Sequence, residues 1–94
     1  MDKRIKILLA DANEEFSQLL AASLNEETEL TVVGSSTGAD ALRLIGETSP
    51  DVVIMDVILA GADGLGLLGE IMKLPEKDRP EVIVLSAFYS ERVI

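Results

Sequence analysis

Four short apolar runs are spaced along the chain, and polar or amphipathic segments separate them. The runs cover residues 5–10, 30–34, 52–57 and 82–86. The third and fourth runs are nearly continuous and rich in β-branched residues, which is typical of strands buried on both faces of a parallel sheet. We therefore predict four strands and expect the last two to be covered on both sides.

Between these runs the apolar residues recur with helical spacing. Asn13 stands just before the first such segment and is a predicted N-cap, and Glu14 and Glu15 favour the positive end of that helix. Three apolar stripes predict three helices. The stripes are Phe16, Leu19, Leu20 and Leu24; Ala41, Leu42 and Ile45; and Leu65, Leu68, Ile71 and Met72.

The alternation of strands and helices predicts a doubly wound parallel sheet, in which ligands bind beyond the carboxyl ends of the strands. Asp11, Asp56 and Ser86 stand at the ends of the first, third and fourth runs. We expect two carboxylates and a hydroxyl to meet there. Asp56 interrupts an apolar run, which favours a functional role, although it also fits a simple cap of the following turn. Ser86 likewise fits a hydroxyl bonded to the backbone.

Residues 64–69 contain the pattern G-x-G-x-x-G, which is found in dinucleotide-binding loops. That function needs a tight turn directly after the strand, whereas Gly64 lies well beyond Asp56. It also needs an acidic residue about 20 positions further on, and none occurs near Ser86. We therefore interpret Gly66 and Gly69 as small contacts where a helix meets its sheet, and we reject a nucleotide-binding enzyme.

Length and charge limit the functions that these residues support. The 94 residues suit one small domain, and the formal net charge of -9 disfavours direct binding to nucleic acid. The absence of Cys and His excludes disulfides, zinc sites and histidine catalysis within this sequence. No apolar run reaches the roughly 18 residues of a membrane span, and no signal peptide is visible. We expect a cytoplasmic protein.

Three segments resemble the receiver domains of two-component response regulators. They read KILLADANEEF, DVVIMDVILAGADGLGLL and PEVIVLSAF, and the resemblance runs from Lys3 to Ile94. It is closest to the receiver of the sporulation-control response regulator of spore-forming bacteria. The resemblance implies a flavodoxin-like α/β fold with strand order 2-1-3-4, here truncated before strand five and helix five. It also implies a single receiver domain over residues 1–94, with no effector domain among them.

The resemblance further implies the chemistry of the site. Asp56 would accept a phosphoryl group from the phosphohistidine of a sensor histidine kinase or phosphotransfer protein in a phosphorelay. The Ser86 hydroxyl and the Ala87 N–H would hold the phosphoryl oxygens, and the switch would reshape the face beyond strand four. Asp11, Asp56 and the Ile58 carbonyl would bind Mg²⁺. The domain would be a signalling phosphoacceptor in transcription regulation, not an enzyme.

The sequence departs from the family pattern in three places. Ala12 replaces the second acid of the acidic pair, so we expect a weakened Mg²⁺ site. Leu59-Ala60 replaces the usual Met-Pro, so we expect a more mobile loop. The chain ends at Ile94, without strand five and its Lys, so we expect self-association through the strand-four edge. These departures leave open a degenerate receiver that acts as a phosphorylation-independent interaction module.

Overall fold

The computed structural model describes residues 4–59 and 62–85, and its elements alternate between strands and helices. The predicted order of strands and helices is confirmed, with a two-strand pair and a short 3-10 helix added to it. The elements are β1 (Ile5–Ala10), α1 (Glu14–Asn25), β2 (Leu30–Ser36), α2 (Ala41–Thr48), β3 (Val52–Asp56), β4 (Ile58–Leu59), β5 (Ala62–Asp63), α3 (Gly64–Met72), η1 (Glu76–Asp78) and β6 (Glu81–Leu85).

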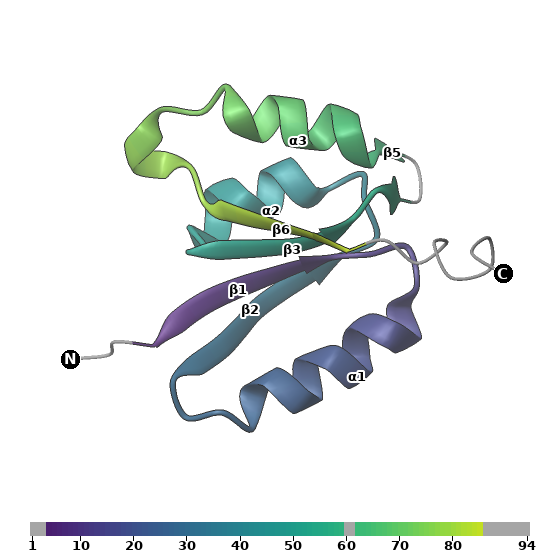
Figure 1. Cartoon of the computed structure of the whole chain (residues 1–94), viewed down its shortest axis with the longest axis vertical. Coiled ribbons are helices and arrows are strands. Elements are labelled where there is room, and N and C mark those ends of the chain that lie inside the picture. Colours follow the sequence, from purple (N-terminus) through teal and green to yellow (C-terminus); the bar gives the residue numbers. More distant parts are fainter. Residues whose placement is uncertain (1–3, 60–61, 86–94) are drawn as a thin grey trace, which may run out of the picture.

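The main sheet has four strands in the order β2-β1-β3-β6, and all three pairings are parallel. β6 is the fourth long strand of the chain, so the predicted order 2-1-3-4 is confirmed. α1 covers one face of the sheet, while α2 and α3 cover the other (Figure 1). Since every strand runs in the same direction, the loops that follow β1, β2 and β3 all leave from one edge of the sheet.

The larger core lies between the sheet and the pair α2 and α3. Three partly buried hydrophobic residues pack against this core: Leu44, Leu74 and Val82. Because side chains alternate across a strand, β1 and β3 each contribute two residues to this face, two positions apart. The buried members are Leu8, Ala10, Ala41, Ile45, Val53, Met55, Leu59, Leu67 and Ile71.

α1 begins where the sequence predicts it, but a different face packs on the sheet. The Asn13 side chain accepts a hydrogen bond from the Phe16 N–H at 3.0 Å, which confirms the N-cap. Phe16 and Leu19 are 41% and 71% exposed, so the predicted stripe is wrong in half of its members, and Ser17 is buried instead. Six of the twelve residues of this helix are apolar, so their spacing does not single out one face.

The same ambiguity affects α3. Leu65 and Met72, predicted as part of its inner stripe, are 66% and 51% exposed. The buried residues are Gly64, Leu67 and Ile71, which follow i, i+3 and i+7. No helix in the described part of the chain is long and apolar enough to cross a membrane.

β6 is more exposed than the sequence predicts. Its run of β-branched residues indicates a strand buried on both faces, yet Ile83 and Val84 are 50% and 45% exposed. Val82 alone among these residues packs against the core. Within the described residues, β6 pairs only with β3, so the fourth run lies at the margin of the described sheet.

Candidate functional site

Two aspartates lie at the carboxyl ends of neighbouring strands. Ala10 of β1 is paired with Met55 of β3, and each is followed directly by an aspartate, Asp11 or Asp56. Both aspartates are half-buried. The structure thus brings these two residues to one edge of the sheet, where parallel α/β sheets bind ligands. Their roles stay predictions.

Asp11 is held by main-chain contacts on both sides. Its N–H donates to the Ser36 carbonyl at the end of β2, at 2.9 Å. Its Oδ1 accepts the Asn13 N–H at 2.8 Å, in the turn that leads into α1. These bonds fix the carboxylate at the mouth of β1. The Asn13 N–H bonds to Oδ1 and not to the other carboxylate oxygen, Oδ2.

Asn13 and Glu14 are the polar neighbours of Ala12, which stands where the family pattern has a second acid. Ala12 is exposed and has no side-chain oxygen. The Asn13 side-chain oxygen caps α1 by accepting the Phe16 N–H. Glu14 is exposed in the first turn of α1. Within the described residues, no three carboxylates gather in a way that holds a metal ion.

The loop after Asp56 turns back on itself through a small antiparallel pair. In this pair Ile58 of β4 is matched with Asp63 of β5, and Leu59 with Ala62. The Asp63 side chain then caps α3 by accepting the Leu65 N–H at 3.2 Å. Ile58, whose carbonyl is a predicted metal ligand, therefore lies in a paired strand two residues beyond Asp56. The predicted mobility of this loop is not tested by these contacts.

The last part of the predicted site follows β6. Asp56 is paired with Leu85 across β3 and β6, and Ser86 is the next residue in the chain. Ser86 and Ala87 lie outside the described residues. The pairing of β3 with β6 therefore places Leu85, the residue before Ser86, beside Asp56.

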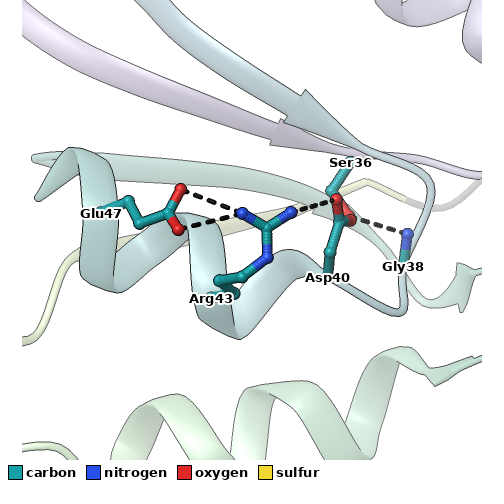
Figure 2. A network of polar contacts seen from close by, with 5 residues as sticks. All are labelled: Ser36, Gly38, Asp40, Arg43 and Glu47. Atoms are coloured by element: carbon teal, nitrogen blue, oxygen red, sulfur yellow. Dashed lines mark hydrogen bonds and ion pairs between the residues drawn. The ribbon is translucent and has the colours of Figure 1, made fainter.

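A polar network that the sequence analysis did not predict extends from the end of β2 along α2 (Figure 2). The buried Ser36 hydroxyl donates to Asp40 Oδ1 at 2.5 Å and accepts the Gly38 N–H at 2.9 Å. Arg43 reaches Asp40 at 3.2 Å and both carboxylate oxygens of Glu47 at 3.0 Å. The spacing of Asp40, Arg43 and Glu47, at i, i+3 and i+7, is the sequence signal that could have identified it.

The network shifts the ionisation of two of its members. The hydrogen bond from Ser36 is the main cause that lowers the pKa of the Asp40 carboxyl, and Arg43 adds to it. The hydrogen bond to Glu47 is the main cause that raises the pKa of Arg43. The ion pairs themselves are solvent-exposed, so solvent screening leaves them only a small contribution to the stability of α2.

A polar cavity of about 350 Å³ lies between Asp11 and this network. Glu14 and Gln18 of α1 line one side, and Ser36 and Asp40 line the other. The surface beside β1 is therefore acidic and open, which suits a cation or a basic side chain better than an anion.

Comparison with known proteins identifies the family. The sequence model of the response regulator receiver domain matches residues 7–94. The chain belongs to this family. Its strand order and the aspartates that end β1 and β3 agree with the receiver domain that the resemblance implies.

Relatives agree with this assignment. The transcriptional regulatory protein LiaR of Bacillus subtilis (strain 168) is 36% identical over 88 residues, which are 93% of this chain and 41% of LiaR. The receiver domain of Francisella response regulator 1452 has a TM-score of 0.78 at 28% identity, covering 96% of this chain and 72% of that one. The phosphorylated cyanobacterial phytochrome response regulator RcpA has a TM-score of 0.78 at 27% identity, covering 95% and 69%.

These relatives limit how far the identification extends. The receiver domain described here spans 41% of the length of LiaR, so the activity of a whole protein does not follow from it. LiaR is named a transcriptional regulatory protein, and the more specific likeness to a sporulation-control regulator is not supported. What is shown is a receiver domain of the kind that response regulators carry.

Proposed function

We propose that this receiver domain accepts a phosphoryl group on the Asp56 carboxylate. The observation that carries the proposal is the position of Asp56, at the carboxyl end of a central parallel strand and beside Asp11. A half-buried carboxylate there is held by its strand yet remains reachable from the edge of the sheet. The relative RcpA, whose structure is described as phosphorylated, supports the proposal.

The donor in this proposal is the phosphohistidine of a sensor histidine kinase or phosphotransfer protein. An Asp56 oxygen attacks the phosphorus in line and forms a P–O bond while the P–N bond breaks. The electron pair stays on the imidazole nitrogen, which then takes a proton from solvent. The Ser86 hydroxyl and the Ala87 N–H hold the phosphoryl oxygens. The product adds close to two negative charges at Asp56, and this charge drives the switch beyond the fourth long strand, β6.

The donor atoms present fit Mg²⁺ in kind but are few. The Asp11 and Asp56 carboxylates and the Ile58 carbonyl are hard oxygen ligands, which Mg²⁺ prefers. Bound Mg²⁺ would offset negative charge on the transferring group. Because Ala12 supplies no ligand and Asn13 caps α1, we expect Mg²⁺ to bind more weakly than at a site with a complete acidic pair.

Labelling by a small phosphodonor tests the proposal. We expect the protein, incubated with Mg²⁺ and acetyl phosphate, to gain the mass of one phosphoryl group and to lose that gain in Asp56→Asn. Asp78→Asn is the matched control, because Asp78 is an exposed aspartate in η1, away from the candidate site. An adduct that persists in Asp56→Asn would contradict the assignment of Asp56.

A degenerate receiver is the second candidate, and Ala12 is the observation that favours it. In that case the domain would bind a partner without being phosphorylated. The exposed position of Ala12 accommodates an aspartate, so Ala12→Asp should raise the labelling rate and the Mg²⁺ affinity if the pocket is otherwise competent. A wild-type protein that is not labelled, together with a labelled Ala12→Asp variant, would support the degenerate receiver.

We also propose that this domain belongs to a longer, cytoplasmic regulator of transcription. The name and length of LiaR support a longer regulator of transcription, and so does the structure of a DNA-binding response regulator with the same fold. With a formal net charge of -9, the domain itself should not contact DNA. A role in sporulation stays a prediction that only genetics in the host can test.

A further inference from the structure

Gly64, the first residue of α3, packs directly against the backbone that follows Asp56. It is buried, and a Cβ at this position would lie 2.6 Å from both the Cα and the carbonyl carbon of Val57, and closer still to its oxygen. These are main-chain atoms, which cannot turn aside as a flexible side chain does. Any side chain at position 64 must therefore separate α3 from Val57.

The same two residues are joined by a hydrogen bond. The Gly64 N–H donates to the Val57 carbonyl at 3.0 Å. Directly beyond this contact, Ile58 is paired with Asp63, and Asp63 caps α3. The first turn of α3 thus packs directly against the backbone that follows Asp56.

The other glycines of the G-x-G-x-x-G pattern show no such constraint. A Cβ at Gly66 would meet the Asp63 side chain at 3.6 Å, an ordinary contact, and a Cβ at Gly69 would meet nothing within 4 Å. Both are exposed. The prediction that Gly66 and Gly69 mark the contact between helix and sheet is therefore wrong, because the close approach occurs at Gly64 alone of the three.

We infer that Gly64 is a positioning residue for Asp56 and for the carbonyl of Ile58. It acts through Val57, which lies between these two residues in the chain. Only a glycine at position 64 allows α3 to approach Val57 so closely. As far as it concerns phosphoryl transfer, the inference rests on the proposed function. A methyl group at position 64 should displace this backbone by roughly 1 Å, and misplacement of that size lowers a rate by about 100-fold.

Three alanine variants separate this role from general effects on α3. Gly64→Ala adds the methyl group at the contact, while Gly66→Ala and Gly69→Ala add the same group one-half turn and more than one turn further along. Backbone NMR shifts of residues 56–58 report the local geometry. The rate of labelling by acetyl phosphate, at saturating Mg²⁺ and well below the melting temperature, reports the reaction per folded molecule.

We expect Gly64→Ala to shift the resonances of residues 56–58 and to slow labelling by about 10- to 100-fold. We expect Gly66→Ala and Gly69→Ala to leave both readouts at wild-type values. A purely structural role would lower the melting temperature and shift only Val57, beside the added methyl group, leaving the resonances of Asp56 and Ile58 and the labelling rate at wild-type values. Wild-type shifts and a wild-type rate in Gly64→Ala would overturn the inference.

A stabilised variant and the chemical shifts cover two cases in which the labelling rate of Gly64→Ala cannot be measured. If Gly64→Ala does not fold, it is made together with Gly46→Ala and Gly69→Ala, because a Cβ at either exposed helix position meets nothing within 4 Å and alanine favours the helix. If the wild type is not labelled by acetyl phosphate, the proposed function fails. The chemical shifts of residues 56–58 still decide whether Gly64 positions Asp56.

Discussion

At the scale of single residues, Asp40 ties the end of β2 to the start of α2 with both carboxylate oxygens. Its Oδ1 accepts the Ser36 hydroxyl and its Oδ2 faces Arg43 (Figure 2). Both contacts favour the ionised carboxylate, and the Ser36 hydrogen bond is the main cause of the lowered pKa of Asp40. Asp40 therefore links the stability of this end of the sheet to pH.

We predict a loss of stability in acid that depends on Asp40. Because its pKa is lower in the folded state, the carboxylate contributes stability above the ordinary aspartate pKa of about 3.9, and this contribution is lost as the pH falls below that value. Urea denaturation between pH 7 and pH 3 should show a smaller acid loss in Asp40→Asn than in the wild type. Asp78→Asn, which removes the same charge from η1, should lose stability as the wild type does; equal slopes in all three proteins would refute the prediction.

At the scale of elements, α3 shows how packing selects a helix face. Five large apolar residues lie on this nine-residue helix, but only Leu67 and Ile71 are buried among them. At the entry of the helix, Gly64 packs on the Val57 backbone and donates its N–H to the Val57 carbonyl, on the same face of α3 as Leu67 and Ile71. The buried face of α3 is therefore the face that carries the Gly64 contact, and hydropathy alone does not distinguish it.

We predict unequal effects of truncating apolar side chains along α3. Ile71 is fully buried in the core, so Ile71→Ala should lower the free energy of unfolding by about 2–5 kcal/mol. Leu65 is 66% exposed, so Leu65→Ala should change it by only about 0.5 kcal/mol. Urea denaturation at pH 7 measures both. Similar losses in the two variants would show that the sequence stripe, rather than the observed face, describes the packing.

At the scale of the whole molecule, the described sheet is covered unevenly. α2 and α3 bury Met55 and Val53 on one face, while Ile83 of β6 remains half exposed. β6 therefore presents backbone groups and apolar side chains at the margin of the described sheet. Such a strand is a template for pairing with another chain.

We predict that the 94-residue chain self-associates through β6 as its concentration rises. Light scattering should show a mass above that of the monomer at high concentration and a return to the monomer on dilution. Ile83→Lys, which places a charge on this strand, should shift the equilibrium toward the monomer. Leu65→Lys serves as the control, since it adds the same charge on α3. A monomer at every concentration would remove the prediction.

Much of the architecture was determined by the sequence alone. Four apolar runs separated by amphipathic segments predict the parallel sheet, because strands buried in such sheets are continuous in hydropathy. The strand order came from the resemblance to receiver domains. The Asn13 cap and the places of Asp11 and Asp56 also followed from local patterns, since caps and strand ends involve neighbours in the chain.

The tertiary structure alone decided which faces pack and which glycine matters. Apolar residues surround α1 and α3, so their spacing leaves the inner face undetermined until each helix meets the sheet. The glycines at positions 64, 66 and 69 looked like one motif, yet of these three only Gly64 lies against another part of the backbone, at Val57. Such a contact joins residues seven apart through a loop whose path the sequence does not encode locally. The three-dimensional turn after Asp56 therefore decides what the glycine does.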